Sequence, residues 1–233
     1  MHDAHFHLSD CDEFHTLVES GIINAHDKNS FKQAQKYRSP KILISFGLHP
    51  WYNYASMNEY KTYFQQCDII GEIGMDCVWS HVSLDKQKQL FIEQLKLAQL
   101  LNKAVILHTK GCEKEIAEII SMYPNIYLVH WYSADCCLQQ YIEQDCYFTI
   151  GPSVVHDINV QSCAKQVPLN RLLLESDGLE ALYWARGMTI SYDKAMYDSL
   201  FTIAKLRNLE VSVLEKILDK NFIDFVNKVV ILK

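Results

Sequence analysis

Histidines and carboxylates follow several short apolar runs of this chain, where they could bind a divalent metal ion. The first run ends in Asp3-Ala-His-Phe-His7, and Glu72 and Asp177 stand at the ends of two others. His108 and His130 each directly follow an apolar run. Imidazole nitrogens and carboxylate oxygens are common ligands of such ions. A bound cation can lower the pKa of its water from about 15.7 towards about 7, which makes hydroxide available at neutral pH.

Each of these residues also has an ordinary structural explanation when it is taken alone. A single histidine after a strand is more often hydrogen-bonded than metal-bound, and Glu72 or Asp177 could cap a helix or form a turn. Five strand ends that each carry a ligand-type residue are much harder to explain in this way. We therefore predict a site for one or two divalent ions (Mg, Mn or Zn), with these ligands: His5, His7, Glu72, His108, His130 and Asp177.

A two-metal arrangement would divide these residues around Glu72. In that arrangement Glu72 bridges the ions, His5, His7 and Asp177 bind one of them, and His108 and His130 bind the other. Open coordination positions would hold water and substrate.

Eight apolar runs must position these ligands. Most are continuously apolar, which is typical of parallel strands that are covered on both faces. The runs are His2–Phe6, Gly21–Ala25, Lys41–Phe46, Asp68–Ile73, Ala104–Leu107, Ile126–Val129, Cys146–Ile150 and Arg171–Leu174.

Helix-like stretches alternate with these runs, and the alternation predicts an α/β fold. A TIM-type (β/α)8 barrel and an open doubly wound sheet both fit, but no glycine-rich nucleotide-binding loop follows any run, which favours the barrel. In a barrel the C-terminal strand ends converge on the active-site face. The helical stretches are Leu84–Asn102, Glu115–Met122, Asp135–Gln144, Tyr192–Arg207 and Val211–Val229, with weaker patterns at Phe31–Tyr37 and Glu59–Gln66.

Composition limits the class of protein and of partner. The chain has 233 residues and no linker-like or repetitive segment, so we expect a single domain over residues 1–233. The formal charge of -6 argues against tight non-specific coating of nucleic acid or anionic lipid. No signal peptide, membrane span or CxxC pair is present, so we expect a cytoplasmic protein with reduced thiols and no membrane partner. A monomer is favoured.

Several short motifs follow one another along almost the whole chain. In this order they resemble the motifs of the TatD family of metal-dependent hydrolases and deoxyribonucleases, which belong to the amidohydrolase-like barrels. The motifs are Asp3-Ala-His-Phe-His-Leu8 (similar to DxHxHL), Gly47-Leu-His-Pro50 (GxHP), Gly71-Glu-Ile-Gly-Met-Asp76 (GEIGLD), the helix with Gln87, Phe91 and Gln94-Leu95 (QxxxFxxQL), His108-Thr-Lys110 (HxR), His130-Trp-Tyr-Ser133 (HCFS), Leu173-Leu-Glu-Ser-Asp177 (LLETD) and Arg186-Gly187 (RG).

The resemblance implies roles for residues in these motifs. The six predicted ligands match the metal ligands of the family, Glu72 and Asp177 match its catalytic carboxylates, and Asp177 would also accept a proton from the attacking water. Lys110 and Arg186 match positions suited to a phosphate, and His49 matches a position in the substrate-binding pocket.

Further residues near strand ends could line the same mouth. Trp51, Trp131 and Tyr132 could stack on bases or pack loops onto the barrel. His26 and His156 follow apolar runs and could also face the substrate.

The resemblance implies a metal-dependent deoxyribonuclease that cleaves DNA phosphodiester bonds, exonucleolytically at a single strand or strand end. Two alternatives remain at this stage: hydrolysis of a small ester, amide or phosphodiester in the same site, and a metal-binding scaffold without turnover.

The chain departs from the family pattern after Asp177 and after Arg186. Gly178 and Leu179 replace a small residue and a proline, and the family's Asn-Glu-Pro after the RG motif is missing. Lys110 replaces an arginine, so a point charge stands in place of a bidentate fork. These differences affect the substrate loops more than the metal ligands.

Overall fold

The computed structural model describes residues 1–8, 18–54, 56–187 and 190–232. Residues 188–189, where part of the missing Asn-Glu-Pro would stand, lie outside the described residues. No helix in the described ranges is long and apolar enough to cross a bilayer.

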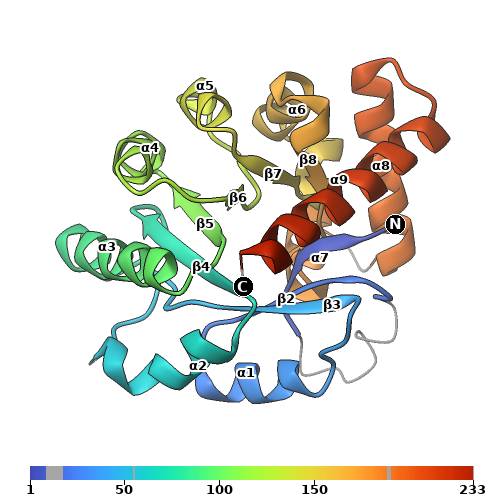
Figure 1. Ribbon diagram of the computed structural model, residues 1–233. Coiled ribbons are helices and arrows are strands. Elements are labelled where there is room, and N and C mark those ends of the chain that lie inside the picture. Colours follow the sequence, from blue (N-terminus) through green and yellow to red (C-terminus); the bar gives the residue numbers. More distant parts are fainter. Residues whose placement is uncertain (9–17, 55, 188–189, 233) are drawn as a thin grey trace.

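The strands of these residues form one eight-stranded parallel sheet in which neighbours follow the order of the sequence. The Asp177 amide, just after β8, donates to the His5 carbonyl of β1 at 3.1 Å, so the sheet curves into a nearly closed barrel (Figure 1). The predicted TIM-type α/β barrel is confirmed. The strands are β1 (Asp3–Phe6), β2 (Gly21–Ala25), β3 (Ile42–Phe46), β4 (Ile69–Asp76), β5 (Val105–Lys110), β6 (Tyr127–Val129), β7 (Tyr147–Ile150) and β8 (Leu172–Leu174).

Helices surround the barrel, and most of the long ones follow the sequence pattern. The helix predicted over Tyr192–Arg207 has those bounds. The helices Ile158–Gln166 and Leu179–Arg186 were not predicted, because each is short and buries few apolar residues. The helices are α1 (Lys28–Gln35), α2 (Lys61–Gln66), α3 (Leu84–Leu100), α4 (Glu113–Ser121), α5 (Leu138–Glu143), α6 (Ile158–Gln166), α7 (Leu179–Arg186), α8 (Tyr192–Arg207) and α9 (Val211–Ile231), with short 3-10 turns η2 (Met57–Tyr60), η3 (Pro152–Val155) and η4 (Leu169–Arg171).

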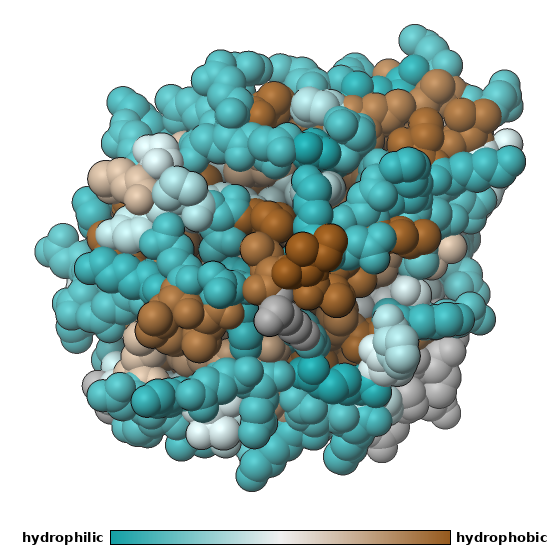
Figure 2. All heavy atoms as spheres, viewed as in Figure 1, coloured by the Kyte–Doolittle hydropathy of each residue, from teal (hydrophilic) through white to brown (hydrophobic). Residues whose placement is uncertain are grey.

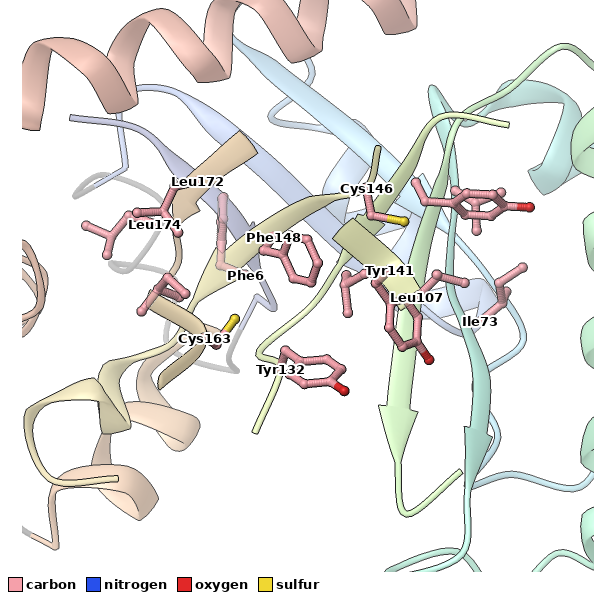
Figure 3. Close-up of a cluster of buried hydrophobic side chains, with 14 of the residues drawn as sticks. Phe6, Ile73, Leu107, Tyr132, Tyr141, Cys146, Phe148, Cys163, Leu172 and Leu174 are labelled. Carbon is pink, nitrogen blue, oxygen red and sulfur yellow. The ribbon is translucent and has the colours of Figure 1, made fainter. Parts of the chain in front are cut away.

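The apolar core has two layers. The larger layer lies between the strands and the surrounding helices, and Figure 3 shows part of it around Phe6, Phe148 and Tyr141. The smaller layer fills the barrel at the N-terminal ends of the strands. Strands of this kind are continuously apolar because both of their faces are covered.

Helix α9 closes the end of the barrel that the smaller layer fills. Phe222, Phe225 and Val229 pack against interior residues of the strands, such as Ile22 and Leu173. In Figure 1, α9 crosses in front of the strands, and Figure 2 shows apolar atoms among a mostly hydrophilic surface on the same face. The opposite, C-terminal ends of the strands are therefore the open face of the barrel.

Candidate metal centre

The six predicted ligands meet at the C-terminal strand ends. Four of them contact the Glu72 carboxylate on β4. His5 Nε2 and His7 Nε2 each lie 3.4 Å from Glu72 Oε2. His108 Nδ1 and His130 Nε2 lie 2.8 Å and 3.7 Å from Glu72 Oε1. Both carboxylate oxygens thus face imidazole nitrogens, as expected of a residue at the centre of such a cluster.

Asp177, just after β8, approaches the same imidazoles from the other side. Its Oδ1 lies 3.3 Å from His5 Nε2 and 3.6 Å from His7 Nε2, and its Oδ2 lies 3.9 Å from His130 Nε2. These separations exceed those of well-formed hydrogen bonds between charged groups.

Three groups of side chains in the described part of the chain bring their ligand atoms within 4.8 Å of one another. The three residues expected to share one ion form one of these groups. His108 and His130, expected to share the other, fall into different groups, because the His130 ring stacks on His5 with centroids 3.8 Å apart. The groups are His5 with His7 and Asp177, His5 with Glu72 and His130, and His49 with Glu72 and His108.

Polar atoms in this cluster are buried without a hydrogen bond. Neither ring nitrogen of His5 has a hydrogen-bond partner among the described residues, and the same holds for Asp177 Oδ1. His5 is completely buried. Buried polar atoms almost always find a partner, and an ion bound by the protein is one accepted reason for an exception. The donor set and these unpaired atoms fit a divalent cation held by nitrogen and oxygen.

Charge interactions in the cluster shift the pKa values of its members in opposite directions. Burial alone lowers the pKa of His5, but the Glu72 and Asp177 carboxylates raise it well above its usual value. Burial favours protonated Glu72, yet His130, His49 and His5 hold the pKa of this carboxyl well below its usual value. Without metal, imidazolium protons therefore balance the buried carboxylates.

Two further carboxylates hold imidazoles in place, and neither was predicted as a site residue. Completely buried Glu175 accepts from His130 Nδ1 at 2.8 Å, which leaves His130 Nε2 facing Glu72 and Asp177. A carboxylate behind a metal-binding histidine fixes its tautomer and orientation. The signal in the sequence was a carboxylate directly after the apolar run that ends at Leu174, beside the predicted ligand Asp177.

Asp76 holds the His108 ring in the same way that Glu175 holds the His130 ring. Its Oδ2 lies 2.9 Å from His108 Nε2 and also accepts from Trp51 Nε1 at 2.5 Å. Burial lowers the pKa of His108, but the contacts with Asp76 and Glu72 outweigh it and raise that pKa to about 9. Asp76 also accepts the backbone N–H groups of Val78 and Trp79 at 2.8 Å, so the turn role that its residue type suggests is present as well.

His49 is buried beside Glu72 and does not lie at the rim of the pocket. Its Nε2 is 3.6 Å from Glu72 Oε1, and its Nδ1 accepts the Trp51 backbone N–H at 3.3 Å. Burial lowers the pKa of His49 to about 4, against the pull of Glu72. A neutral ring with an acceptor Nδ1 carries its proton on Nε2, which faces the cluster.

The glycines on either side of Glu72 allow β4 to approach its neighbour. Gly74 has φ +155, and a Cβ there would lie 1.9 Å from the His108 carbonyl oxygen. A Cβ on Gly71 would lie 2.6 Å from Cβ of Ile106. Only glycine permits this approach of β4 to β5, which brings Glu72 and His108 together.

Two departures from regular alternation aim His5 and Glu72 inward. The β1–β2 pairing shifts register within Asp3–Phe6, and the β4–β5 pairing shifts between Ile70 and Ile73. Such irregularities redirect side chains and are common beside active sites.

Asp3 and Gly178 join β1 to the segment after β8. Buried Asp3 accepts the Ser176 backbone N–H at 3.0 Å and its hydroxyl at 2.6 Å. Gly178 has φ +88, and a Cβ on it would lie 2.8 Å from the His7 carbonyl oxygen. The glycine that departs from the family pattern is therefore required by the close approach to His7.

Of the two predicted phosphate-binding residues, only Lys110 faces the cavity at the strand ends. Its Nζ donates to Ser133 Oγ at 2.9 Å, and both residues line the cavity. Arg186 does not line it: its Nη2 donates to Asp198 Oδ2 on α8 at 3.1 Å. The ion pair with α8 draws this arginine away from the mouth.

The predicted aromatic residues also divide into those that line the cavity and one that does not. Trp131 lines the cavity, and its Nε1 donates to Ser153 Oγ at 2.9 Å. Tyr132 does not line it, contrary to our expectation. Its ring is buried between Tyr141 and Phe148 (Figure 3), because the chain after β6 turns it towards the helices.

The cavity itself has a volume of about 880 Å3 and lies directly over the cluster. His26 and His156, which the sequence left as residues that could face the substrate, both line it, as does Trp51. A drug-sized or nucleotide-sized ligand fits a cavity of this volume.

Comparisons with known proteins agree with this architecture. A family model described as TatD related DNase matches residues 2–227. An uncharacterized metal-dependent hydrolase of Methanocaldococcus jannaschii is 27% identical over 222 residues, which cover 90% of this chain and 84% of that protein. The human protein named deoxyribonuclease TATDN3 is 25% identical over 123 residues, which cover 50% of this chain and 45% of that protein. The crystal structure of YjjV, a TatD homologue from Escherichia coli, has the same fold, with a TM-score of 0.74 and 22% identity over 88% of this chain and 85% of that one.

Proposed function

This chain belongs to the family of TatD-related DNases and is a metal-dependent hydrolase, and from that premise we propose that it cleaves phosphodiester bonds of DNA at a single strand or strand end. The observation that carries the proposal is the cluster around Glu72, with His5 and Asp177 atoms buried and unpaired in the described structure. The name deoxyribonuclease borne by a relative supports the choice of DNA.

The six ligands of the proposed site would hold one or two divalent ions. A cation bound there would act as a Lewis acid on a phosphoryl oxygen and would lower the pKa of a coordinated water. Glu175 and Asp76 would keep the His130 and His108 rings oriented for binding. The ligand set is His5, His7, Glu72, His108, His130 and Asp177.

Asp177 is suited to accept the proton of the attacking water. Burial favours its protonated form, but His130 and His5 hold the pKa of this carboxyl below its usual value, so it is ionised at neutral pH. Its Oδ1 faces the cluster without a hydrogen-bond partner in the described ranges. That oxygen can take a proton from a nucleophile placed between it and the substrate.

Lys110 and His49 would bind the scissile phosphate. Lys110 Nζ has three donors, of which Ser133 takes one, and the others can reach a phosphoryl oxygen in the cavity. His49 would donate from Nε2 while remaining neutral. The formal charge of -6 omits bound metal, whose positive charge would lie where the phosphate must sit.

A substrate can reach the cluster only from the open mouth of the barrel. The end opposite the cluster is filled by the interior apolar layer and covered by α9. A polynucleotide therefore cannot pass through the barrel and must enter and leave by the same mouth.

A chelator-controlled assay tests the proposed function. The purified protein is treated with EDTA, supplied in turn with Mg, Mn and Zn, and assayed on single-stranded DNA, duplex DNA, bis(para-nitrophenyl) phosphate and para-nitrophenyl acetate. We expect hydrolysis of single-stranded DNA that chelation abolishes and metal restores. Glu72→Gln should remove it, whereas Glu118→Gln, on the exposed side of α4, should not.

Other outcomes would contradict the proposal in distinguishable ways. Activity that survives chelation, or a Glu72→Gln variant as active as the parent, excludes the metal mechanism. Hydrolysis of the acetate ester alone favours the small-molecule alternative. Metal binding without turnover of any substrate favours a scaffold.

A further inference from the structure

All four tryptophans of the chain line the cavity above the candidate metal centre. Trp51 follows β3, Trp79 follows β4, Trp131 follows β6 and Trp184 lies on α7 after β8. Their rings meet edge to face in series, with centroids 6.0 Å apart for Trp51 and Trp79, 5.9 Å for Trp79 and Trp184, and 6.2 Å for Trp131 and Trp184. Four such residues at one mouth are a concentration that packing of separate loops does not require.

The contact between Trp79 and Trp184 spans the mouth. Strands β4 and β8 are separated by three strands in an eight-stranded sheet that curves into a barrel, so they stand on opposite sides. The two indoles therefore meet above the cluster from opposite walls. Both indoles and Glu72 line the same cavity.

The same two indoles are the most exposed members of the series, followed by Trp51 at 41%. Trp184 is 68% exposed and Trp79 is 46% exposed. By contrast, Trp51 and Trp131 are held by hydrogen bonds from their Nε1 atoms to Asp76 and Ser153. Exposed aromatic surface beside a binding cavity commonly marks a contact with a ligand.

A positive charge lies beside the exposed pair. Lys110 Nζ sits 4.9 Å from the Trp79 ring centroid, within the range of a cation–π contact. Aromatic faces next to a cation are the combination that binds single-stranded nucleic acid, because bases stack while phosphates are neutralised. In an edge-to-face pair only one face of one ring is covered by its partner, so the contact between Trp79 and Trp184 leaves the other indole faces uncovered by that contact.

We propose that Trp79 and Trp184 stack on unpaired nucleobases and thereby select single-stranded nucleic acid ends over duplex. This inference rests on the proposed function, since it names the part of the DNA that the same cavity recognises. A base in a duplex is already paired and stacked, and it must leave that arrangement before it can occupy the cavity. Unpaired bases avoid this penalty.

Binding of a hydrolysis-resistant strand tests the inference without relying on turnover. The metal-loaded protein is titrated with phosphorothioate oligothymidylate that carries an internal fluorophore, and with an abasic strand of the same backbone, while anisotropy is followed. A blunt duplex is titrated in the same way. We expect the abasic strand and this duplex to bind more weakly than oligothymidylate. Trp184→Ala and Trp79→Ala should each weaken oligothymidylate binding by about 5- to 150-fold and leave abasic binding unchanged.

Matched variants separate stacking from general damage. Tyr183→Ala changes an exposed aromatic residue on the same helix that does not line the cavity, so it should bind like the parent. Trp184→Phe should restore part of the affinity, because phenyl also stacks. Equal binding of base-bearing and abasic strands, or tryptophan variants that bind like the parent, would overturn the inference.

Failure of the inference and failure of the proposed function give different results. Base-dependent binding through both tryptophans, with no hydrolysis of DNA or of bis(para-nitrophenyl) phosphate, would retain the inference and reject the nuclease proposal. Metal-dependent hydrolysis with no preference for base-bearing strands would retain the nuclease proposal and reject the inference.

Discussion

At the scale of single residues, carboxylates behind the imidazoles decide how the cluster is arranged. Glu175 holds His130 and Asp76 holds His108, each through one ring nitrogen. The remaining nitrogen of each ring is thereby aimed at Glu72. Partners of this kind raise the basicity of a ligating histidine, and their loss commonly reduces metal affinity or activity by about 10- to 100-fold.

Glu175→Gln should reduce metal affinity by about 10- to 100-fold while the fold is retained, because the amide keeps the size of the side chain but loses its charge. Isothermal titration with Mn or Zn measures the affinity, and circular dichroism monitors the fold. Glu118→Gln, an exposed change on α4, is the control. Unchanged affinity would show that Glu175 does not position His130.

Metal binding should release protons and weaken as pH falls. In the metal-free protein the pKa of His5 is raised well above its usual value by Glu72 and Asp177, and that of His108 is raised to about 9. Both rings are therefore imidazolium cations at pH 7, and a metal ion must displace a proton from each of them. Affinity should rise with pH up to about 9.

Calorimetry at pH 7 in two buffers of different ionisation enthalpy counts the protons released. Titrations from pH 6 to 9 then follow the affinity. Binding without proton release, or with an affinity independent of pH, would contradict this reading of the cluster.

At the scale of elements, alternation along the strands explains part of the site. On β5, Ile106 lies in the interior apolar layer, and His108 follows two residues later on the same side. Leu128 and His130 stand in the same relation at the end of β6. Sequence spacing alone therefore predicts these inward positions.

On β1 and β4 the same rule fails. Ala4 is interior, so strict alternation would turn His5 outward, yet His5 faces the cluster and Phe6 lies in the outer layer. The register shifts in β1 and β4 reverse the alternation at those points, and they aim Glu72 in the same way. Pairing with neighbouring strands decides such a shift, and the sequence of one strand does not reveal it.

Gly74→Ala should break this element-level arrangement. The new Cβ would stand 1.9 Å from the His108 carbonyl oxygen at φ +155, so β4 and β5 must separate. We expect the free energy of unfolding to fall by about 4 kcal/mol or more and metal binding to be lost. Urea unfolding and metal titration measure the two effects.

Gly187→Ala is the matched control. Gly187 also has a positive φ of +60, but a Cβ there meets nothing within 4 Å in the described structure. Only the strain of the left-handed backbone applies, at about 1–2 kcal/mol. Equal losses for the two variants would mean that the approach of β4 to β5 is not what requires Gly74.

At the scale of the whole molecule, stability and chemistry occupy opposite ends of the barrel. α9 and the interior apolar layer close the N-terminal end, and the cluster with its cavity occupies the C-terminal end. This separation is general in (β/α)8 barrels. Changes at the closed end should therefore alter stability without altering the reaction.

Phe225→Ala tests the separation. Phe225 is completely buried, with its ring 5.0 Å from that of Tyr147. We expect the free energy of unfolding to fall by about 3–5 kcal/mol, and kcat/KM to stay at the parent value below the unfolding temperature. Ile223→Ala, 51% exposed on the same helix, should change neither. A parallel fall in activity of the folded Phe225→Ala protein would reject the separation.

The sequence by itself determined the barrel and the identity of the candidate ligands. Continuous apolar runs define the strands, because strands covered on both faces have no polar side, and the residues that end those runs must meet on one face. The single domain over residues 1–233 and the monomeric state stay predictions.

Only the tertiary structure decided which residues meet in space. It turned Tyr132 into the core and drew Arg186 to Asp198. It also brought Trp79 and Trp184 together from opposite walls. These outcomes depend on loop paths and on partners distant in the chain, which local spacing cannot encode. A continuous apolar run can be recognised within one short segment of the sequence, whereas a contact across the mouth exists only after the barrel has closed.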